Sequence, residues 1–594
     1  MAQKDRKFFH VLILLLKRKL TSGQYMILWS IIVGLSTGLL AVLLKTVAHY
    51  LQHLLTESYK SNNFNYIIIL FPLAGILLSV TYIRFFLKNR FGGGSGPILH
   101  SIAKKSSFVE KETIYSHVIS SALTVGFGGS VGLESPIAVA GAAVGSNYGR
   151  VILMNYKERT LLLASGAAAG IATVFNAPIA GVMFALEVLL TDITISGFIP
   201  IIIASAAGAL CSNIILQEKI LLSFNFHSPF NYENIPFYIL LAIIASLFSI
   251  FYARFFLKIE KAFKKGKERT YPKAIIGGIL LGLIILVFPP LFGEGYESIK
   301  VLASGSPERI LNNTFFYFLK GNNLFLILFI TVIALLKTFA ASLTVSSGGN
   351  GGNFAPSLFS GAFLGFAFAE ILSLLGINVP VFNFIIVGMA GVLTGIMYAP
   401  LTGIFLIAEL TGGYQLIIPL MLVSVLTYAI VKHFEPYSLD KKDLAEEGNL
   451  LTYNRDKNIL TMLELSSMIE TNFKVVSHNA NIEQLANIIS HSKRNIFPIV
   501  DEENNLVGII SLDEIREFLF EMSVYKDMLA LELMSKPPAV IEFNEHMDSV
   551  MEKFEETGAW NLPVVKNKKY VGFISKSSVL SKYRNKLISD YSNE

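Results

Sequence analysis

The sequence predicts an all-α protein that crosses a membrane many times, followed by a smaller soluble α/β region. Of its 594 residues, 53% are hydrophobic and only 15% are charged, whereas an average soluble protein has about 25% charged residues. Because about 20 apolar residues span the hydrocarbon core of a bilayer, long apolar segments indicate membrane-crossing helices. The clearest of these segments are 26–46, 64–86, 193–216, 236–257, 273–292, 324–345 and 414–432.

The first 22 residues are expected to form a cytoplasmic helix that lies against the membrane. The segment FFHVLILLLKRKL resembles a signal peptide, but its apolar run is short and no small-residue cleavage site follows it. Its basic residues favour a cytoplasmic N-terminus by the positive-inside bias: Lys4, Arg6, Lys7, Lys17, Arg18 and Lys19. Such juxtamembrane residues explain the net charge of +6 without a nucleic-acid partner. The single cysteine, Cys211, excludes an intramolecular disulfide and is expected to be a small packing residue.

Composition divides the chain into a membrane domain and a charged C-terminal region. We expect the membrane domain over 23–440 and a linker over 441–462. A pair of α/β modules is expected over 463–590, with approximate bounds of 463–522 and 528–587. The pairing of modules follows from NIFPIVDEENNLVGIIS, which resembles WNLPVVKNKKYVGFIS further along the chain. The modules share the cytoplasm with the N-terminus if the number of crossings is even.

The membrane domain contains an internal duplication. FNAPIAGVMFALE (175–187) reappears as MYAPLTGIFLIAE (397–409), and GLESP (132–136) corresponds to GNFAP (352–356) at nearly the same offset. Coincidence could explain either pair alone, but two pairs in the same order indicate a duplicated half. We expect halves over about 23–218 and 236–432, an architecture in which transporters bind substrate at the midplane between the repeats.

Three segments share one design, in which glycines precede a proline and an apolar helical run follows. They are GGGSGPILHSI (92–102), GLESPIAVAGAAVG (132–145) and GGNGGNFAPSLFSGAFLG (348–365). Proline suits the first turn of a helix, and a helix N-terminus with unpaired N–H groups attracts anions. Three such ends converging within a membrane would hold a small anion weakly, without any lysine or arginine, as conduction requires. The alternative for each segment is an ordinary capped helix in a glycine-tolerant bundle.

Glu134 lies at the start of the second of these segments. A carboxylate near a helix N-terminus can take the place of an anion, and it would leave that place when protonated. A helix-capping glutamate is the alternative explanation. An ionisable group within a membrane is a functional hypothesis by default, so we favour the gate.

These residues resemble the CLC family of chloride channels and chloride/proton antiporters. GSGP is similar to the family's GSGIP motif, GLESP to its G-[KR]-E-G-P and GGNFAP to its G-x-F-x-P, and the paired modules are similar to CBS domains. The resemblance implies two inverted halves of tilted and re-entrant helices, a homodimer with one pore per subunit, and chloride as the transported ligand. It implies Glu134 as the external gate in a multi-pass protein of the cell membrane. The implied anion-binding residues are Ser95, Gly96, Gly132, Leu133, Asn353, Phe354 and Tyr437.

Four departures from the family pattern bear on these roles. GSGP lacks the isoleucine of the family motif, and Leu133 and Ser135 replace a basic residue and a glycine beside the gate. The inner tyrosine of the family is represented by Tyr437, although a gapless alignment of EPYSLDKK places Asp440 there. The fourth departure is Val188, which occupies the position of the glutamate that relays protons in family antiporters.

Val188 favours a passive chloride channel, because coupled exchange needs two protonatable stations and valine carries no proton. Some proton-coupled members do without the inner glutamate, so a chloride/proton antiporter is the alternative. Glu187, matched by Glu409 in the other half, is expected to be a structural helix residue.

The first CBS-like module supplies a possible adenine-nucleotide site. GIISLDE provides Ser511 with Asp513 or Glu514, a pattern that holds a ribose in related modules, whereas GFISKSS provides Ser575 without an acid. A purely structural, dimerising pair is the alternative.

Other functional classes fit the sequence less well. A divalent-cation transporter would need converging acidic residues in the membrane, and the glycine-rich helix starts favour anions instead. A fluoride-selective relative is disfavoured because Ser95 follows the chloride-type pattern. The sequence contains no metal-binding Cys/His spacing, phosphate-binding loop or nucleophile elbow, so neither an enzyme nor a metal or other required cofactor is expected.

Overall fold

The computed structural model contains two compact units, Met1–Glu447 and Gly448–Glu594, which are described separately. The segment 1–15, which holds most of the expected N-terminal helix, lies outside the described residues, as does most of the expected linker. The structure describes residues 16–57, 66–87, 96–104, 106–190, 195–216, 229–264, 270–442, 463–520, 524–525 and 528–591.

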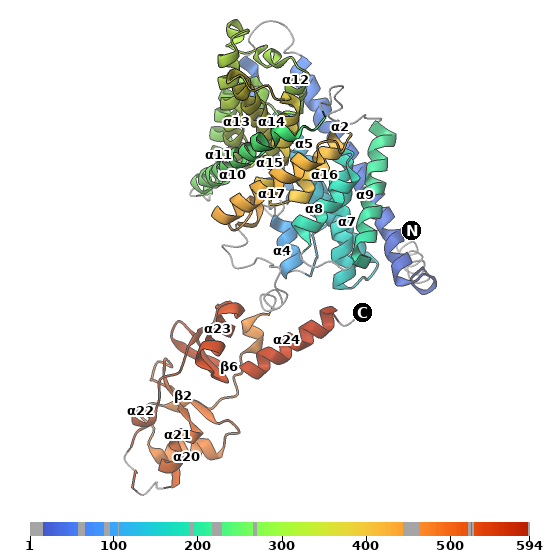
Figure 1. The fold of residues 1–594 in the computed structure, drawn as a ribbon. Coiled ribbons are helices and arrows are strands. Elements are labelled where there is room, and N and C mark those ends of the chain that lie inside the picture. The colour runs from blue at the N-terminus through green and yellow to red at the C-terminus, as the bar shows by residue number, and fades with distance from the viewer. Residues whose placement is uncertain are drawn as a thin grey trace. The chain divides into compact units, whose positions relative to one another are not determined.

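The regular elements described in the first unit are all helices (Figure 1). Its first half contains α2 (Ser22–Glu57), α3 (Leu70–Leu87), α4 (Gly96–Lys104), α5 (Glu112–Gly126), α6 (Glu134–Val151), α7 (Tyr156–Phe175), α8 (Pro178–Phe184) and α9 (Ile195–Leu216). Its second half contains α10 (Ile235–Lys264), α11 (Thr270–Val287), α12 (Tyr296–Ala303), α13 (Asn323–Ser346), α14 (Phe354–Leu374), α15 (Val381–Met397), α16 (Pro400–Leu410) and α17 (Ile417–Phe434).

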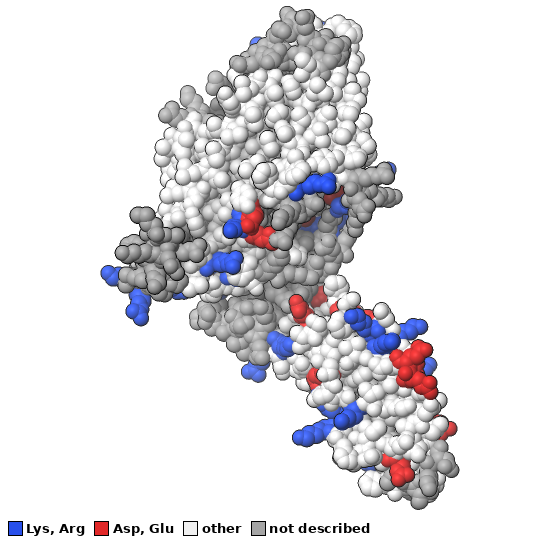
Figure 2. All heavy atoms as spheres, turned by 180° about the vertical axis from the view of Figure 1, so that it is seen from behind, with Lys and Arg blue, Asp and Glu red and all other residues white. Residues whose placement is uncertain are grey.

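Within the described residues, eight helices are long and apolar enough to cross a membrane. Seven of them overlap the seven apolar segments predicted from the sequence, which agrees with the expected fold class. The eighth is Phe354–Leu374, the helix that follows the third glycine-rich start. Figure 2 shows a wide expanse of the first unit without charged side chains, whereas the second unit carries both signs of charge on the same view.

The two halves pack their central helices through glycines at corresponding places. A Cβ atom built on Gly166 of α7 would lie 1.9 Å from the carbonyl oxygen of Gly141 on α6. In the second half, a Cβ atom on Gly388 of α15 would lie 2.5 Å from the carbonyl oxygen of Gly361 on α14. Both helix pairs therefore rely on direct backbone approach, as small-residue interfaces in membranes do.

The duplicated FNAPIAG and MYAPLTG segments form the same corner in both halves. Asn176 and Tyr398 end α7 and α15 in the left-handed conformation, with φ of 53° and 58°, and a proline begins the next helix in each case. Glu187 lies in the π-helical turn η2 (Ala185–Leu189) that continues α8, and Glu409 lies on α16.

Each of these two glutamates caps the start of a helix in the other half of the membrane unit. The Glu187 carboxylate accepts hydrogen bonds from the backbone N–H groups of Leu401 (2.9 Å) and Thr402 (2.8 Å) at the start of α16. The Glu409 carboxylate accepts from the N–H groups of Ile179 (3.0 Å) and Ala180 (2.8 Å) at the start of α8. The reciprocal bonds support the structural role predicted for Glu187.

The second unit consists of two small three-stranded sheets with the same topology. The first sheet has the order β1 (Val476–Ser477), β2 (Ile496–Val500), β3 (Leu506–Ser511), and the second β4 (Ile541–Glu542), β5 (Asn561–Lys566), β6 (Lys569–Ser575). In each sheet the first pair of strands is parallel and the second antiparallel. The helices around them are α20 (Ile482–Ser490), α21 (Leu512–Phe520), α22 (Ala530–Leu533), α23 (Met547–Thr557) and α24 (Lys576–Tyr591).

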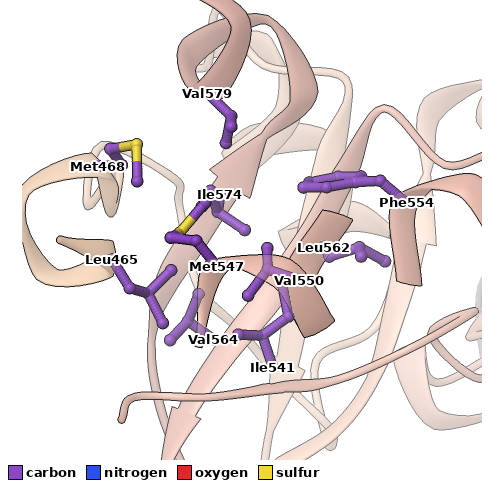
Figure 3. Close-up of a cluster of buried hydrophobic side chains, with 10 residues drawn as sticks. All are labelled: Leu465, Met468, Ile541, Met547, Val550, Phe554, Leu562, Val564, Ile574 and Val579. Atoms are coloured by element: carbon purple, nitrogen blue, oxygen red, sulfur yellow. The ribbon is translucent and has the colours of Figure 1, made fainter. Parts of the chain in front are cut away.

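Each module has its own hydrophobic core, and the two modules also meet. The second core gathers apolar side chains from β4, β5, β6, α23 and α24 around Phe554 and Val550, which are fully buried (Figure 3). Ile509 of β3 and Phe573 of β6 pack in one shared cluster with Phe473. The repeated α/β units predicted from the sequence thus form a joined pair.

Candidate functional site

The starts of α6 and α14 are held against each other by a backbone bridge between the two halves. Gly132 donates to the Gly352 carbonyl (3.0 Å), and Gly352 donates to the Gly132 carbonyl (2.9 Å). A Cβ atom on Gly352 would lie 2.5 Å from Ser135 Cβ, so the approach requires glycine. Two of the three predicted glycine-rich helix starts therefore meet, and their N–H groups open on one region.

Glu134 lies in that region, fully buried, between the two helix starts. Its Oε1 accepts a hydrogen bond from the Tyr296 hydroxyl at 2.5 Å, while its Oε2 has no hydrogen-bond partner among the described residues. A Cβ atom on Gly132 would lie 1.8 Å from this Oε2 and 2.9 Å from Ala355 Cβ on α14. The carboxylate thus occupies the space that the missing side chain of Gly132 leaves open.

A buried cation stands next to the site, contrary to the expectation that no lysine or arginine would be present. Lys337 of α13 is fully buried, and its Nζ donates to the Ser130 hydroxyl (2.9 Å) and the Gly293 carbonyl (2.8 Å). Its charge interacts with Glu134 and Glu294. The prediction failed because Lys337 lies some two hundred residues from GLESP in the sequence.

Glu294 is a second carboxylate at the same place, and the sequence analysis missed it. The side chain is 7% exposed, and its Oε1 accepts from the backbone N–H of Leu133 (3.2 Å), the residue before α6. Its Oε2 lies 3.4 Å from Nε2 of His49 on α2. The signal that could have found it is the charge of GEGYES directly after the apolar segment 273–292, since ionisable residues among apolar membrane segments are functional candidates by default.

Aromatic side chains pack beneath the two helix starts. Phe354, the first residue of α14, lies 5.5 Å from Phe175 and 6.3 Å from Phe184 between ring centroids. Phe175 in turn meets Tyr296 edge-to-face at 6.4 Å. Glu134 and Tyr296 are therefore backed by a packed apolar cluster, which contributes to the burial of the Glu134 carboxylate.

The expected inner tyrosine, Tyr437, is 43% exposed. Tyr252 of α10 is instead fully buried, and its hydroxyl donates to Oδ1 of Asn353 at 2.9 Å. Asp440, the other residue considered for this position, interacts electrostatically with Tyr252. The tyrosine next to the α14 start thus comes from a helix that the motif comparison did not consider.

The remaining predicted residues of the membrane unit are only partly placed. Gly96 begins α4, and α4 contacts α6, but Ser95 lies outside the described residues. Val188 is buried in the π-helical turn beside Glu187.

In the first CBS-like module, the three predicted residues lie at the junction of β3 and α21. Glu514 accepts hydrogen bonds from the Ser511 N–H (3.2 Å) and the Ser535 hydroxyl (3.4 Å). Asp513 pairs with Arg516 at 2.7 Å, and its side chain is 82% exposed. Among the described residues, no group of three or more Asp, Glu, His or Cys side chains could hold a metal ion.

Comparison with known protein families identifies both units. Residues 75–432 match the family described as voltage gated chloride channel, and residues 465–521 and 530–585 each match the CBS domain. The chain is 26% identical over 557 residues to the chloride channel protein CLC-e of Arabidopsis thaliana, which covers 82% of this chain and 75% of that protein. It is 30% identical over 426 residues to the H+/Cl− exchange transporter ClcA of Yersinia pestis, covering 68% and 83%.

Solved structures share the fold. A slow cyanobacterial Cl−/H+ antiporter aligns with a TM-score of 0.61 and 20% identity, covering 72% of this chain and 99% of that one. A eukaryotic CLC transporter aligns with a TM-score of 0.61 and 17% identity, covering 93% and 97%. The fold likeness therefore extends over both the helical unit and the C-terminal pair.

Proposed function

The chain belongs to the voltage-gated chloride channel family, called CLC, whose members move chloride across membranes, and we propose that it is a passive chloride channel gated by Glu134. The observation that carries the proposal is the unpaired carboxylate oxygen of Glu134 between the starts of α6 and α14. Helix N-termini attract anions, so the carboxylate acts as a tethered anion. Protonation neutralises the carboxylate, which then leaves the anion site, and chloride binds there.

The choice of a channel rests on the cytoplasmic side of the pathway. Val188 carries no proton, and the neighbouring Glu187 is engaged by N–H groups of α16. A proton that reaches Glu134 therefore has no second carboxylate at the usual position. A chloride/proton exchanger is the second candidate, because relatives such as the ClcA proteins carry that description.

The deciding experiment is flux from the purified full-length protein in liposomes, with chloride and proton movements recorded together. We expect chloride to run down its gradient without driving protons uphill. The Glu134→Gln variant mimics the protonated gate, so its chloride flux is expected to be higher at neutral pH and less dependent on pH. Uphill proton uptake driven by chloride would establish the exchanger instead, and unaltered flux in Glu134→Gln would remove Glu134 as the gate.

Family resemblance supports three further assignments. We assign to the chain a homodimer with one pathway per subunit, a place in the cell membrane, and cytoplasmic N- and C-termini. In this assignment the anion-binding residues are Ser95, Gly96, Gly132, Leu133, Asn353, Phe354 and Tyr437. The buried Tyr252, which donates to Asn353, is a further candidate for the inner position.

An adenine nucleotide is the proposed ligand of the CBS pair, at Ser511, Asp513 and Glu514. The exposed Asp513 carboxylate supports this assignment. It pairs with Arg516 at the surface, and such an ion pair contributes little energy, so a ribose could replace it. Calorimetric titration of the full-length protein with ATP, ADP and AMP tests the assignment. Binding that Asp513→Asn weakens supports it, and no heat with any of the three nucleotides excludes it.

A further inference from the structure

We infer that Glu294 is a second gate, placed between His49 and the Glu134 site, and that anion entry from the His49 side requires Glu294 to be protonated and displaced. The inference rests on the proposed function of the Glu134 site and adds a residue that neither the family motifs nor the duplication identifies. Its substrate is the same small anion, and its second ligand is a proton from solution.

The geometry places Glu294 where an incoming anion would bind. Its Oε1 accepts a hydrogen bond from the backbone N–H of Leu133 at 3.2 Å, and Leu133 is the N-cap residue of α6. The neighbouring Glu134 supplies an independent sign that the site accepts a ligand, since its Oε2 is fully buried without a hydrogen-bond partner among the described residues. Two carboxylates therefore fill one amide-lined site.

The charges around the site explain why the two carboxylates do not both stay ionised when an anion enters. When ionised, Glu134 and Glu294 carry two negative charges, and the buried Lys337 interacts electrostatically with both. A chloride would add a third negative charge to this buried site, where repulsion is stronger than in water. Protonation of Glu294 restores the balance and frees the Leu133 N–H for the anion.

His49 connects Glu294 to solution. The Nε2 atom of His49 lies 3.4 Å from Glu294 Oε2, and the histidine side chain is 45% exposed whereas Glu294 is 7% exposed. His49 lies twenty-seven residues after Ser22, the first residue of α2, which is about 40 Å along the helix at 1.5 Å per residue and exceeds the hydrocarbon thickness of about 30 Å. The histidine thus lies far from the N-terminal end of α2, and its partly exposed side chain links Glu294 to solvent on that side.

The elements near Glu294 also carry other charged and titratable groups. Lys337 of α13 holds the carbonyl of Gly293, the residue before Glu294. The Tyr296 hydroxyl donates to Glu134. On α2, Lys45 lies one turn before His49 and donates to the Val174 carbonyl at 3.4 Å. The described charged and titratable groups that interact with Glu294 are therefore Glu134, Tyr296, His49 and the buried Lys337.

The test compares Glu294→Gln with Glu297→Gln in the full-length protein. Glu297 lies three residues further along and is a matched control, because its carboxylate is 87% exposed and pairs only with Lys300 among the described residues. Chloride binding is measured by calorimetry in detergent, and chloride flux is measured in liposomes as the pH on the His49 side is varied. We expect Glu294→Gln to bind chloride at least about threefold more tightly at neutral pH, since a charge at a helix N-terminus competes with the anion. Glu297→Gln is expected to match the wild type.

Combination with the first gate separates the two proposals. We expect Glu134→Gln to retain a pH-dependent part of its flux and the double variant Glu134→Gln/Glu294→Gln to lose it. If Glu134→Gln is already independent of pH and Glu294→Gln binds chloride like the wild type, the second gate is refuted while the first stands. If the wild type carries no chloride, the proposed function itself fails.

Two further variants keep the inference testable if Glu294→Gln does not fold. Glu294→Asp keeps the charge but withdraws it from the Leu133 N–H, so it is expected to bind chloride more tightly and to retain pH dependence. His49→Gln keeps a hydrogen-bond donor without a titratable proton, so flux is expected to rise more slowly after an acid jump. Wild-type behaviour in both variants would overturn the assignment.

Discussion

The reciprocal carboxylates of the duplicated corner are predicted to stabilise the membrane unit rather than to carry protons. Glu187 accepts three hydrogen bonds from α16, including one from the Thr402 hydroxyl at 2.7 Å, and Glu409 accepts two from α8. Removal of a cap costs about 0.5–2 kcal/mol, and a hydrogen bond to a charged group contributes about 1.5–3 kcal/mol. Because both carboxylates are partly exposed, we expect a loss of about 2–4 kcal/mol for Glu187→Ala and about 1–3 kcal/mol for Glu409→Ala.

The chain offers its own reporter for this measurement. Cys211 is the sole cysteine of the sequence and is buried, so a thiol-reactive fluorogenic dye reports unfolding of the purified protein on heating. Glu187→Gln keeps one acceptor oxygen and is expected to lose less stability than Glu187→Ala. Glu297→Ala, which removes an exposed ion pair, is the control and is expected to melt close to the wild type.

Two patterns of results would refute the reasoning. If Glu187→Ala melted like the wild type but changed the ratio of proton to chloride movement in liposomes, then Glu187 would be a proton station and the capping role would be wrong. Equal losses in Glu187→Ala and Glu187→Gln would also contradict it, because the capping role assigns part of the stability to each bond.

Two other predictions concern packing and pH. Gly166→Ala is expected to disrupt folding of the membrane unit, because its Cβ would lie 1.9 Å from the Gly141 carbonyl oxygen. Gly23→Ala is the tolerated control, because nothing lies within 4 Å of its Cβ. The purified yield and the melting temperature in the dye assay compare the two variants, and equal melting temperatures would contradict the packing argument. Burial acts to raise the pKa of Glu545, but hydrogen bonds, mainly from Lys553, outweigh it and hold the pKa below its usual range. The stability that Glu545 contributes is thus present above its unfolded pKa and is lost as pH falls through its folded pKa. Glu545→Gln should therefore weaken the hydrogen-exchange protection of residues 541–566 at neutral pH but not in acid. An equal loss of protection at both pH values would refute this prediction.

The sequence predicts the fold class and the paired helix starts because these features depend on local patterns. Apolar length indicates the crossings, and the repeated motifs place Glu134 and Phe354 at corresponding helix starts. The glycines before them predict close backbone approach, and the bridge between Gly132 and Gly352 realises it. Such features require only spacing and residue type within a short segment.

The charged surroundings of the site could not be predicted in the same way. His49, Glu294 and Lys337 come from α2, from the turn before α12 and from α13, and no local spacing links them. Each looks like an isolated polar residue in an apolar stretch, and only the folded chain brings them to the α6 N-terminus. Tyr252 was missed for a related reason, since the motif comparison searched for a tyrosine near the end of the membrane domain, whereas the buried one lies on α10.

The glycine bridge between the halves limits how the protein can work. Gly132 and Gly352 clamp the two helix openings together with a pair of backbone hydrogen bonds, and the Ser135 side chain leaves no slack beside Gly352. Rocking of one half against the other would have to break this clamp in every cycle. Passage of an ion is therefore expected to need only side-chain movements while the backbones of the two halves stay in place. Such movements span a few ångströms, which favours fast turnover.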